Sequence, residues 1–214
     1  MVITSENYNI DHFINHRNVI GNNKKRRLIQ LEHLTYALDC IKLQQGLVLE
    51  FGVYNGRSIN TIADVLPYMA VNGFDTFTGL PEEWTRSEDI VFKEGKFKTK
   101  NLPNVRDNVT LHKGLFEDTL PKFIKDNNDS VSFCHIDCDL YSSTNTVLNL
   151  LNKKIVPGTV IVFDELYPFG DYSSYTNWKN HEYKALQEWI HNYNREFEIV
   201  SRSSVQQCAI RIIK

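Results

Sequence analysis

Val131-Ser-Phe-Cys-His-Ile-Asp-Cys-Asp-Leu-Tyr141 is the stretch from which the rest of the chain can be understood. It begins as an apolar run and ends in two carboxylates, Asp137 and Asp139, one residue apart. This pattern is typical of a buried strand that delivers charge to the edge of a sheet. The same design returns in Thr159-Val-Ile-Val-Phe-Asp-Glu165. The two stretches predict neighbouring strands of a parallel sheet, with their acids in one crevice.

Crowded carboxylates are costly unless a cation or a proton offsets their charge. The acids therefore indicate a divalent metal site, a general base, or both, and their spacing alone leaves either role open to Asp137 and Asp139. In an extended strand both share a face with His135, while Cys134 and Cys138 point to the opposite face. We interpret His135 as a hydrogen-bonded structural residue and the two cysteines as part of the core.

Composition indicates an ordinary soluble protein with one large core. The chain has 214 residues, of which 42% are hydrophobic and 23% charged, and its formal net charge of -2 gives no reason to expect nucleic acid or a membrane as a partner. The basic run Lys24–Arg27 is interpreted as the solvated start of a helix. The sequence shows no transmembrane segment and no apolar signal region.

Four cysteines that form no C-x-x-C pair predict free thiols, mostly buried, in a reducing compartment, which makes the cytoplasm the expected location. They are Cys40, Cys134, Cys138 and Cys208.

Apolar periodicity divides the chain into strands and helices in alternation. Leu28 to Leu43 reads as an amphipathic helix, and five strand–helix alternations follow from residue 46. Such alternation predicts a mostly parallel α/β sheet with helices on both faces. The last two strands have too short a connection for a parallel crossover, so the final strand should run antiparallel. We expect an N-terminal helical or lid segment over residues 1–45 and one domain over residues 46–214.

A glycine turn follows the first strand of that domain. Gly52 and Gly56 separate the strand Leu47–Phe51 from a helix that begins near Ser58. A strand, glycine turn and helix in this order let backbone N–H groups meet an anionic ligand. Two glycines are a weak signal alone, but Asp75 follows roughly 20 residues later, where doubly wound folds place a carboxylate on ribose hydroxyls.

The glycine turn and the strand-terminal residues should meet at one edge of the sheet, because ligands of such folds bind at the carboxyl ends of the strands. Those residues are Asp75, Gly114, Asp137, Asp139, Asp164 and Glu165.

Five ordered motifs resemble those of the macrocin O-methyltransferase family. They are Glu50-Phe-Gly-Val-Tyr-Asn-Gly-Arg-Ser58, Phe74-Asp-Thr-Phe-Thr-Gly-Leu-Pro81, Gly114-Leu-Phe-Glu-Asp-Thr-Leu-Pro121, His135-Ile-Asp-Cys-Asp-Leu-Tyr-Ser-Ser143 and Val160-Ile-Val-Phe-Asp-Glu165. The resemblance implies a Rossmann-like class I methyltransferase fold, with a mostly parallel seven-stranded sheet whose last strand is antiparallel. It also implies S-adenosylmethionine as methyl donor, a divalent cation such as Mg²⁺, and an acceptor hydroxyl.

Site residues follow from the same resemblance. It assigns the metal to Asp137, Asp164 and Glu165, and the role of general base to Asp139. The family usually has Asp at the position of Glu165, so this chain departs from it there. The resemblance implies a donor site formed by Glu50, Gly52, Val53, Tyr54, Ser58, Asp75, Phe77, Gly114, Leu115, Phe116 and Asp137.

The expected acceptor is a small molecule with a hydroxyl group, either a sugar or a polyphenol-like compound. Residues 76–108 and 166–181 form long aromatic loops that should shape its pocket. Their rings could stack on the acceptor or pack the loops down, and they include Trp84, Tyr167, Tyr172, Tyr175 and Trp178. A homodimer is one expected assembly.

Three alternatives stay open from the residues. A nicotinamide-dependent dehydrogenase shares the strand–glycine–helix start, but Gly52-x-x-x-Gly56 lacks the G-x-G-x-x-G spacing. A protein that binds the donor or a nucleotide without catalysis is favoured by the departure at Glu165. A metal-dependent phosphohydrolase would use the strand-terminal acids but would leave the glycine turn and Asp75 unexplained.

Overall fold

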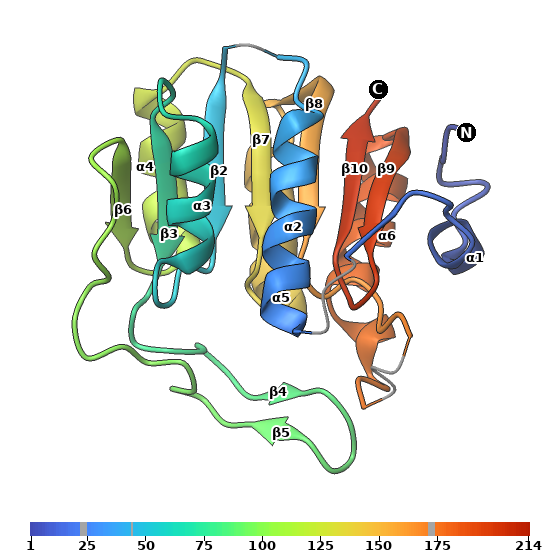
Figure 1. Ribbon diagram of the computed structural model, residues 1–214, viewed down its shortest axis with the longest axis horizontal. Coiled ribbons are helices and arrows are strands. Elements are labelled where there is room, and N and C mark those ends of the chain that lie inside the picture. The colour runs from blue at the N-terminus through green and yellow to red at the C-terminus, as the bar shows by residue number, and fades with distance from the viewer. Residues whose placement is uncertain (22–24, 44, 171–173) are drawn as a thin grey trace.

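One mixed sheet forms the centre of the molecule (Figure 1). The structure is a computed structural model that describes residues 1–21, 25–43, 45–170 and 174–214. Within these residues the main sheet has eight strands in the order β1-β9-β10-β8-β7-β2-β3-β6. Its strands are β1 (Val19–Ile20), β2 (Leu47–Phe51), β3 (Val71–Asp75), β6 (Val109–Lys113), β7 (Val131–Ile136), β8 (Ile155–Phe163), β9 (Phe197–Ser203) and β10 (Cys208–Ile212).

The pairing confirms the predicted topology. β2 pairs in parallel with β3 and β7, β7 with β8, and β3 with β6, while β10 runs antiparallel to both β8 and β9. One strand was not predicted: the two-residue β1 pairs in parallel with β9 and makes the sheet eight strands wide instead of seven. Ile3 also bridges to Phe197, so the described N-terminal residues pack along the β9 edge.

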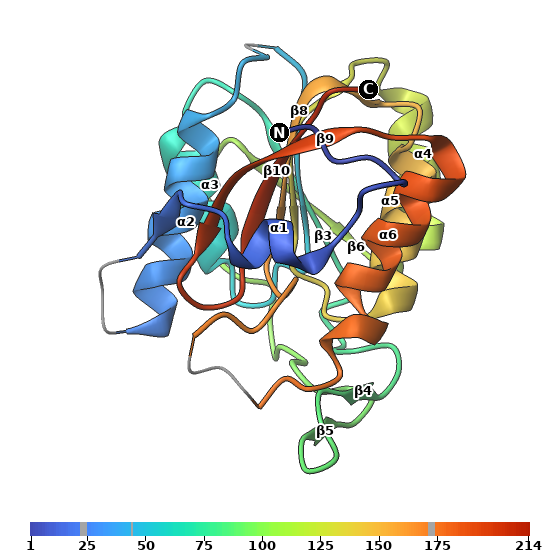
Figure 2. The same ribbon diagram turned by 90° about the vertical axis from the view of Figure 1, so that its right-hand side faces the viewer.

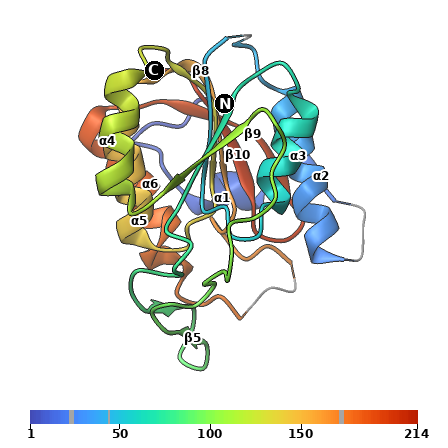
Figure 3. The same ribbon diagram turned by 90° about the vertical axis from the view of Figure 1, so that its left-hand side faces the viewer.

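Helices cover both faces of the sheet. Figures 2 and 3 show α2 and α3 on one side and α4, α5 and α6 on the other. Their bounds are α1 (Ile10–Ile14), α2 (Arg26–Asp39), α3 (Arg57–Val65), α4 (Phe116–Asp126), α5 (Tyr141–Leu151) and α6 (Glu182–Tyr193), with a 3₁₀ turn η1 (Trp178–Asn180) before α6. Among the described residues, no helix is both long and apolar enough to cross a membrane.

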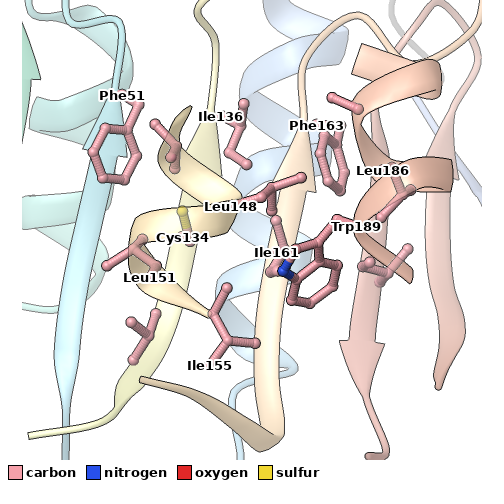
Figure 4. Packing of buried hydrophobic residues seen from close by; sticks show 14 of the residues in the cluster. Phe51, Cys134, Ile136, Leu148, Leu151, Ile155, Ile161, Phe163, Leu186 and Trp189 are labelled. Atoms are coloured by element: carbon pink, nitrogen blue, oxygen red, sulfur yellow. The ribbon is translucent and has the colours of Figure 1, made fainter. Parts of the chain in front are cut away.

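Burial explains why the strands read as apolar runs. Every residue of β2 and β7 is buried, as expected for strands covered on both faces. Figure 4 shows part of one hydrophobic core, where residues of β7 and β8 such as Cys134 and Ile161 pack against Leu148 of α5 and Trp189 of α6. The four cysteines are free thiols, as predicted, although Cys40 is only half-buried.

Two boundaries differ from the sequence prediction. The glycine and proline that bound Gly114–Pro121 predict a turn there, but α4 begins at Phe116 and contains Pro121. Proline removes one helical hydrogen bond, and the burial of Phe116, Leu120 and Phe123 on the inner face of α4 offsets that loss. β8 is also longer than predicted, because it begins at Ile155 and includes Pro157 and Gly158.

The carboxyl ends of the parallel strands meet at one edge, the lower edge in Figure 1. A small hairpin of β4 (Trp84–Thr85) and β5 (Val91–Phe92) lies beyond this edge. It belongs to the connection that the sequence predicted to be irregular.

Candidate functional site

A cleft of about 730 Å³ opens at the carboxyl edge of the sheet. It is lined by the turn after β2, by the ends of β3, β7 and β8, by the hairpin β4–β5 with its neighbouring loop, and by residues of α2, α4 and α5 near their N-terminal ends. A smaller cavity of about 180 Å³ adjoins it on the α2–α3 side and shares Gln30, Tyr54, Asp137 and Asp164 with it. The predicted convergence of glycine turn and acids is therefore present.

Gly52 brings the turn after β2 against the end of β7. It has a φ of +93°, and a Cβ placed there would lie 1.8 Å from the carbonyl oxygen of Asp137. Only glycine combines this left-handed backbone with so close an approach. The glycine turn therefore lies directly beside the acid-bearing strand end.

Asp75 braces the same turn from β3. Its Oδ2 accepts hydrogen bonds from the backbone N–H groups of Val53 (2.9 Å) and Tyr54 (2.8 Å), and its Oδ1 accepts one from Phe77 (2.6 Å). Asp75 also lines the cleft. The residue predicted for ribose binding thus has a structural task, which its position in the sequence did not reveal.

The acids form two overlapping groups. Oxygens of Asp137, Asp139 and Glu165 lie within 4.8 Å of one another, and so do ligand atoms of His135, Asp137 and Asp164. Asp137 belongs to both groups and is the centre of the cluster. Asp139 has a φ of +64°, a left-handed conformation that Asp tolerates better than most residues.

Asp164 is the most firmly held of these carboxylates. Its Oδ2 accepts a hydrogen bond from Nε2 of Gln30 at 2.8 Å, and its Oδ1 accepts one from the amide of Gln207. His135 Nε2 lies 3.5 Å from Oδ1 of Asp164, and His135 Nδ1 lies 2.8 Å from Oε1 of Glu50. His135 is therefore a hydrogen-bonded buried residue, as predicted.

This arrangement shifts the pKa values of Asp164 and His135 in opposite directions. Burial works against charge on both residues, but the hydrogen bond and charge of His135 outweigh it and lower the pKa of Asp164. Burial likewise opposes charge on His135, but the neighbouring carboxylates of Asp164 and Glu50 raise its pKa well above the ordinary value. These directions favour a charged imidazole beside an ionised Asp164, while burial raises the pKa of Glu50.

Asp137 and Asp139 lie in the opposite situation. Burial, followed by the charge of Asp164, raises the pKa of Asp137 well above its ordinary value. Burial and the charge of Glu165 do the same to the pKa of Asp139. Like charges held this close favour a proton or a cation between them.

Glu165 has one held oxygen and one that lacks a partner. Its Oε1 lies 3.2 Å from Arg26 Nη2, and its backbone N–H donates to Oε2 of Glu182 at 3.0 Å. Its buried Oε2 has no hydrogen-bond partner among the described residues. A buried oxygen of this kind, beside two crowded carboxylates, fits a hard divalent cation.

The residues predicted to bind the donor separate into three groups. Gly52, Tyr54, Asp75, Leu115, Phe116 and Asp137 line the large cleft, while Val53 and Ser58 line the smaller cavity. Gly114 donates its N–H to the carbonyl of Asp75 at 3.0 Å. The structure places Glu50 in the sheet interior, bonded to His135, and Phe77 in the core beside α2 and α3.

No sequence pattern marks the residues that support the acids. Gln30, Gln207 and Glu182 are scattered polar residues of α2, the β9–β10 connection and α6, and no motif singles them out. Arg26 belongs to the basic run that was interpreted as a solvated helix start. It instead reaches into the cleft.

Comparison with known proteins names the fold. A family described as a methyltransferase domain matches residues 49–166, which is more than half of the chain. The chain belongs to this family. No curated protein sequence gives a significant match to this methyltransferase.

Several solved structures share its fold. CalS11, a calicheamicin methyltransferase, aligns with a TM-score of 0.68 and 20% identity over 95% of this chain and 82% of that one. NovP, an O-methyltransferase, aligns with a TM-score of 0.60 and 19% identity over 87% and 81%. MycE, a methyltransferase of the mycinamycin pathway, aligns with a TM-score of 0.53 and 13% identity over 85% and 49%.

These likenesses confirm the Rossmann-like methyltransferase architecture. Membership in the methyltransferase family also argues against the dehydrogenase and phosphohydrolase alternatives.

Proposed function

We propose that this methyltransferase moves a methyl group from S-adenosylmethionine to a hydroxyl of a sugar or another small molecule, with Mg²⁺ or a similar cation bound beside the acceptor. The observation that carries the proposal is the shared cleft, in which the glycine turn at Gly52 and the acids at Asp137 and Asp139 face one space. The resemblance to the macrocin O-methyltransferase family supports it, and a cytoplasmic location goes with it.

The comparison structures add support for the chemistry. CalS11 is described in a second structure as a TDP-rhamnose 3'-O-methyltransferase, and the MycE structure contains Mg and S-adenosylhomocysteine. Those properties belong to those proteins. They agree with a hydroxyl acceptor and an acid-bound cation in this chain.

The donor would lie along the β2 side of the cleft. Gly52, Tyr54 and Asp75 border that side, and Leu115 and Phe116 offer an apolar surface for the adenine ring. Asp75 keeps capacity for a ligand, because each carboxylate oxygen can accept more than one hydrogen bond. Its bonds to Val53 and Tyr54 also hold the turn in place before the donor arrives.

The cation would be held by Asp137, Asp164 and Glu165. Asp137 lies within ligand reach of both others through the two acid groups. The amides of Gln30 and Gln207 occupy one lone pair on each Asp164 oxygen and fix its orientation, as outer partners of metal ligands do. When bound, Mg²⁺ supplies a positive charge that lowers the pKa of an acceptor hydroxyl.

Asp139 would receive the proton of that hydroxyl. It lines the cleft beside Asp137 and lies within the same acid group. A hydroxyl is a poor nucleophile, and a positioned carboxylate that removes its proton speeds the attack on the methyl carbon. The chain's own part is therefore to align the acceptor with the methyl group, exclude water and take the proton.

Calorimetric titration with S-adenosylhomocysteine, with and without Mg²⁺, tests the donor and the cation. We expect one site per chain, and Mg²⁺ binding that Asp137→Asn removes. Asp129→Asn is the matched control, since Asp129 lies in the exposed turn before β7. Failure of S-adenosylhomocysteine to bind under either condition would refute the donor assignment. Turnover that EDTA does not reduce would show that the reaction needs no divalent cation.

Asp139→Asn tests the base on any acceptor that supports turnover. Loss of general base catalysis should lower kcat by about 100-fold or more while S-adenosylhomocysteine affinity is unchanged. Full turnover by this variant would show that another group takes the proton. Binding of the donor without turnover on any acceptor would instead favour the non-catalytic alternative.

A further inference from the structure

Two segments that are far apart in the sequence join beside the cleft. Asn177 donates from Nδ2 to the carbonyl of Thr85 at 2.8 Å and from its backbone N–H to the carbonyl of Arg86 at 2.9 Å. His181 Nε2 also lies 3.1 Å from the Thr85 carbonyl oxygen. The hairpin β4–β5 and residues 174–181 therefore form one unit, which we call the roof.

Arg86 is a cation of this roof that also lines the cleft. Its guanidinium carbon lies 4.9 Å from the ring centroid of Trp84 and 4.7 Å from that of Tyr175. No carboxylate lies within ion-pair distance of it among the described residues, although several acids line the same cleft. Two aromatic faces hold the charge in place without neutralising it.

The roof also contains an unusual set of unsatisfied donors. Within the described residues, Trp84 Nε1, Arg86 Nε, Tyr175 Oη and His181 Nδ1 are buried without hydrogen-bond partners. Trp84 and Tyr175 are 1% and 0% exposed. In native proteins nearly all buried polar groups have hydrogen-bond partners, so a local set of groups without partners calls for an explanation. Except for the histidine nitrogen, whose role depends on its tautomer, they are groups that donate hydrogen bonds.

The roof lies within electrostatic reach of the acids. Burial raises the pKa of Tyr175, the charges of Glu165 and Asp139 raise it further, and the charge of Arg86 opposes them. The Tyr175 hydroxyl thus interacts electrostatically with both Arg86 and the acid cluster. A small molecule could contact Arg86 and still present a hydroxyl to the acids.

We propose that Arg86 anchors an oxyanion, a phosphate or a carboxylate, carried by the acceptor. The inference rests on the proposed function and narrows its acceptor to a negatively charged molecule. The planar guanidinium offers paired N–H donors that match either oxyanion, and its contacts with two nearly perpendicular rings restrict their direction. Trp84 and Tyr175 then act as supports for Arg86 rather than as stacking surfaces for a sugar, because their rings are buried against Arg86 and each other.

The test follows the indole N–H signal of Trp84 by NMR in ¹⁵N-labelled protein, titrated with and without S-adenosylhomocysteine. Thymidine diphosphate probes a phosphate, glucuronate probes a carboxylate, and methyl glucoside is the neutral comparison. We expect at least one anionic probe to bind and shift the Trp84 signal, and the neutral sugar to bind more weakly. Arg86→Gln should weaken that binding by about tenfold or more, as expected for loss of a charge-assisted bond.

Arg106→Gln is the matched control. Arg106 pairs with Asp64 at 2.6 Å, and neither residue lines either cavity. This variant should bind the probes as the wild type does. Arg86→Lys keeps the positive charge but loses the paired donors of the guanidinium, so its affinity for the anionic probe should lie between those of the wild type and Arg86→Gln. If Arg86→Gln does not fold, Arg86→Lys takes its place in the test.

The outcomes separate the two proposals. A response to thymidine diphosphate alone assigns a phosphate, and a response to glucuronate alone assigns a carboxylate. Binding of neither probe, or equal binding by the wild type and the Arg86 variants, overturns the oxyanion site even where S-adenosylhomocysteine binds. Failure of S-adenosylhomocysteine to bind refutes the proposed function, whatever the probes do.

Discussion

At the scale of single residues, the site depends on where the backbone can approach closely. Gly52 allows the turn after β2 to touch the carbonyl of Asp137, and Asp75 then ties that turn to β3 through Val53 and Tyr54. Two kinds of contact thereby join the donor side of the cleft to its acid side. One is the approach of the Gly52 backbone to the Asp137 carbonyl, and the other is the set of hydrogen bonds that the Asp75 carboxylate accepts from the turn. A side chain at position 52 would force them apart.

Gly52→Ala should therefore be strongly destabilising. The new Cβ meets the Asp137 carbonyl and the residue must keep a left-handed φ, so we expect a loss of about 2–5 kcal/mol in the free energy of unfolding. Gly95→Ala is the matched control, because Gly95 has a φ of +79° but its Cβ would meet only the Thr78 carbonyl oxygen at 4.0 Å. It should lose about 1–2 kcal/mol. Urea unfolding measures both, and equal losses would contradict the close approach.

At the scale of elements, α2 connects the sheet to the acid cluster. Gln30 holds Asp164, and His33, one turn further along the helix, lies fully buried with Nε2 3.0 Å from Oγ of Ser201 on β9. Burial lowers the pKa of His33 to about 4. The helix thus carries a neutral histidine against the sheet at neutral pH.

His33 should make the stability of the protein depend on pH. Its folded-state pKa of about 4 lies below the ordinary value of 6.5. The unfolded chain therefore takes up a proton first as the pH falls, and this linkage removes stability between about pH 6.5 and 4. The full effect is on the order of 3 kcal/mol. Urea unfolding in EDTA across this range should show a smaller loss for His33→Gln than for the wild type, and parallel curves would contradict a depressed pKa.

At the scale of the whole molecule, the sheet order brings the functional residues together. β7 lies between β2 and β8, so the acids stand beside the glycine turn on one side and beside Asp164 and Glu165 on the other. The roof, which consists of the hairpin β4–β5 and residues 174–181, lies beyond this edge of the sheet. Tyr172 lies outside the described residues. A ligand in the cleft would contact segments drawn from most of the chain.

Binding should for that reason stabilise the protein as a unit. S-adenosylhomocysteine at about 100 times its dissociation constant should add about 2.7 kcal/mol and raise Tm by several degrees. Mg²⁺ should add a further increase in the wild type and none in Asp137→Asn, because that variant loses a central carboxylate. Calorimetric melting measures both increments. An equal Mg²⁺ increment in Asp137→Asn would mean that the cation binds elsewhere.

The sequence by itself determined the α/β architecture, the antiparallel last strand and the location of the acids, because these depend on local patterns. Apolar runs mark the buried strands, and Asp137, Asp164 and Glu165 directly follow theirs. Only the tertiary structure decided that Asp75 braces the glycine turn, that Gln30 holds Asp164, and that Arg86 packs against both Trp84 and Tyr175. Such contacts join distant positions, 134 residues apart for Gln30 and Asp164. No local periodicity encodes them, because side-chain partners across a sheet edge are chosen by packing.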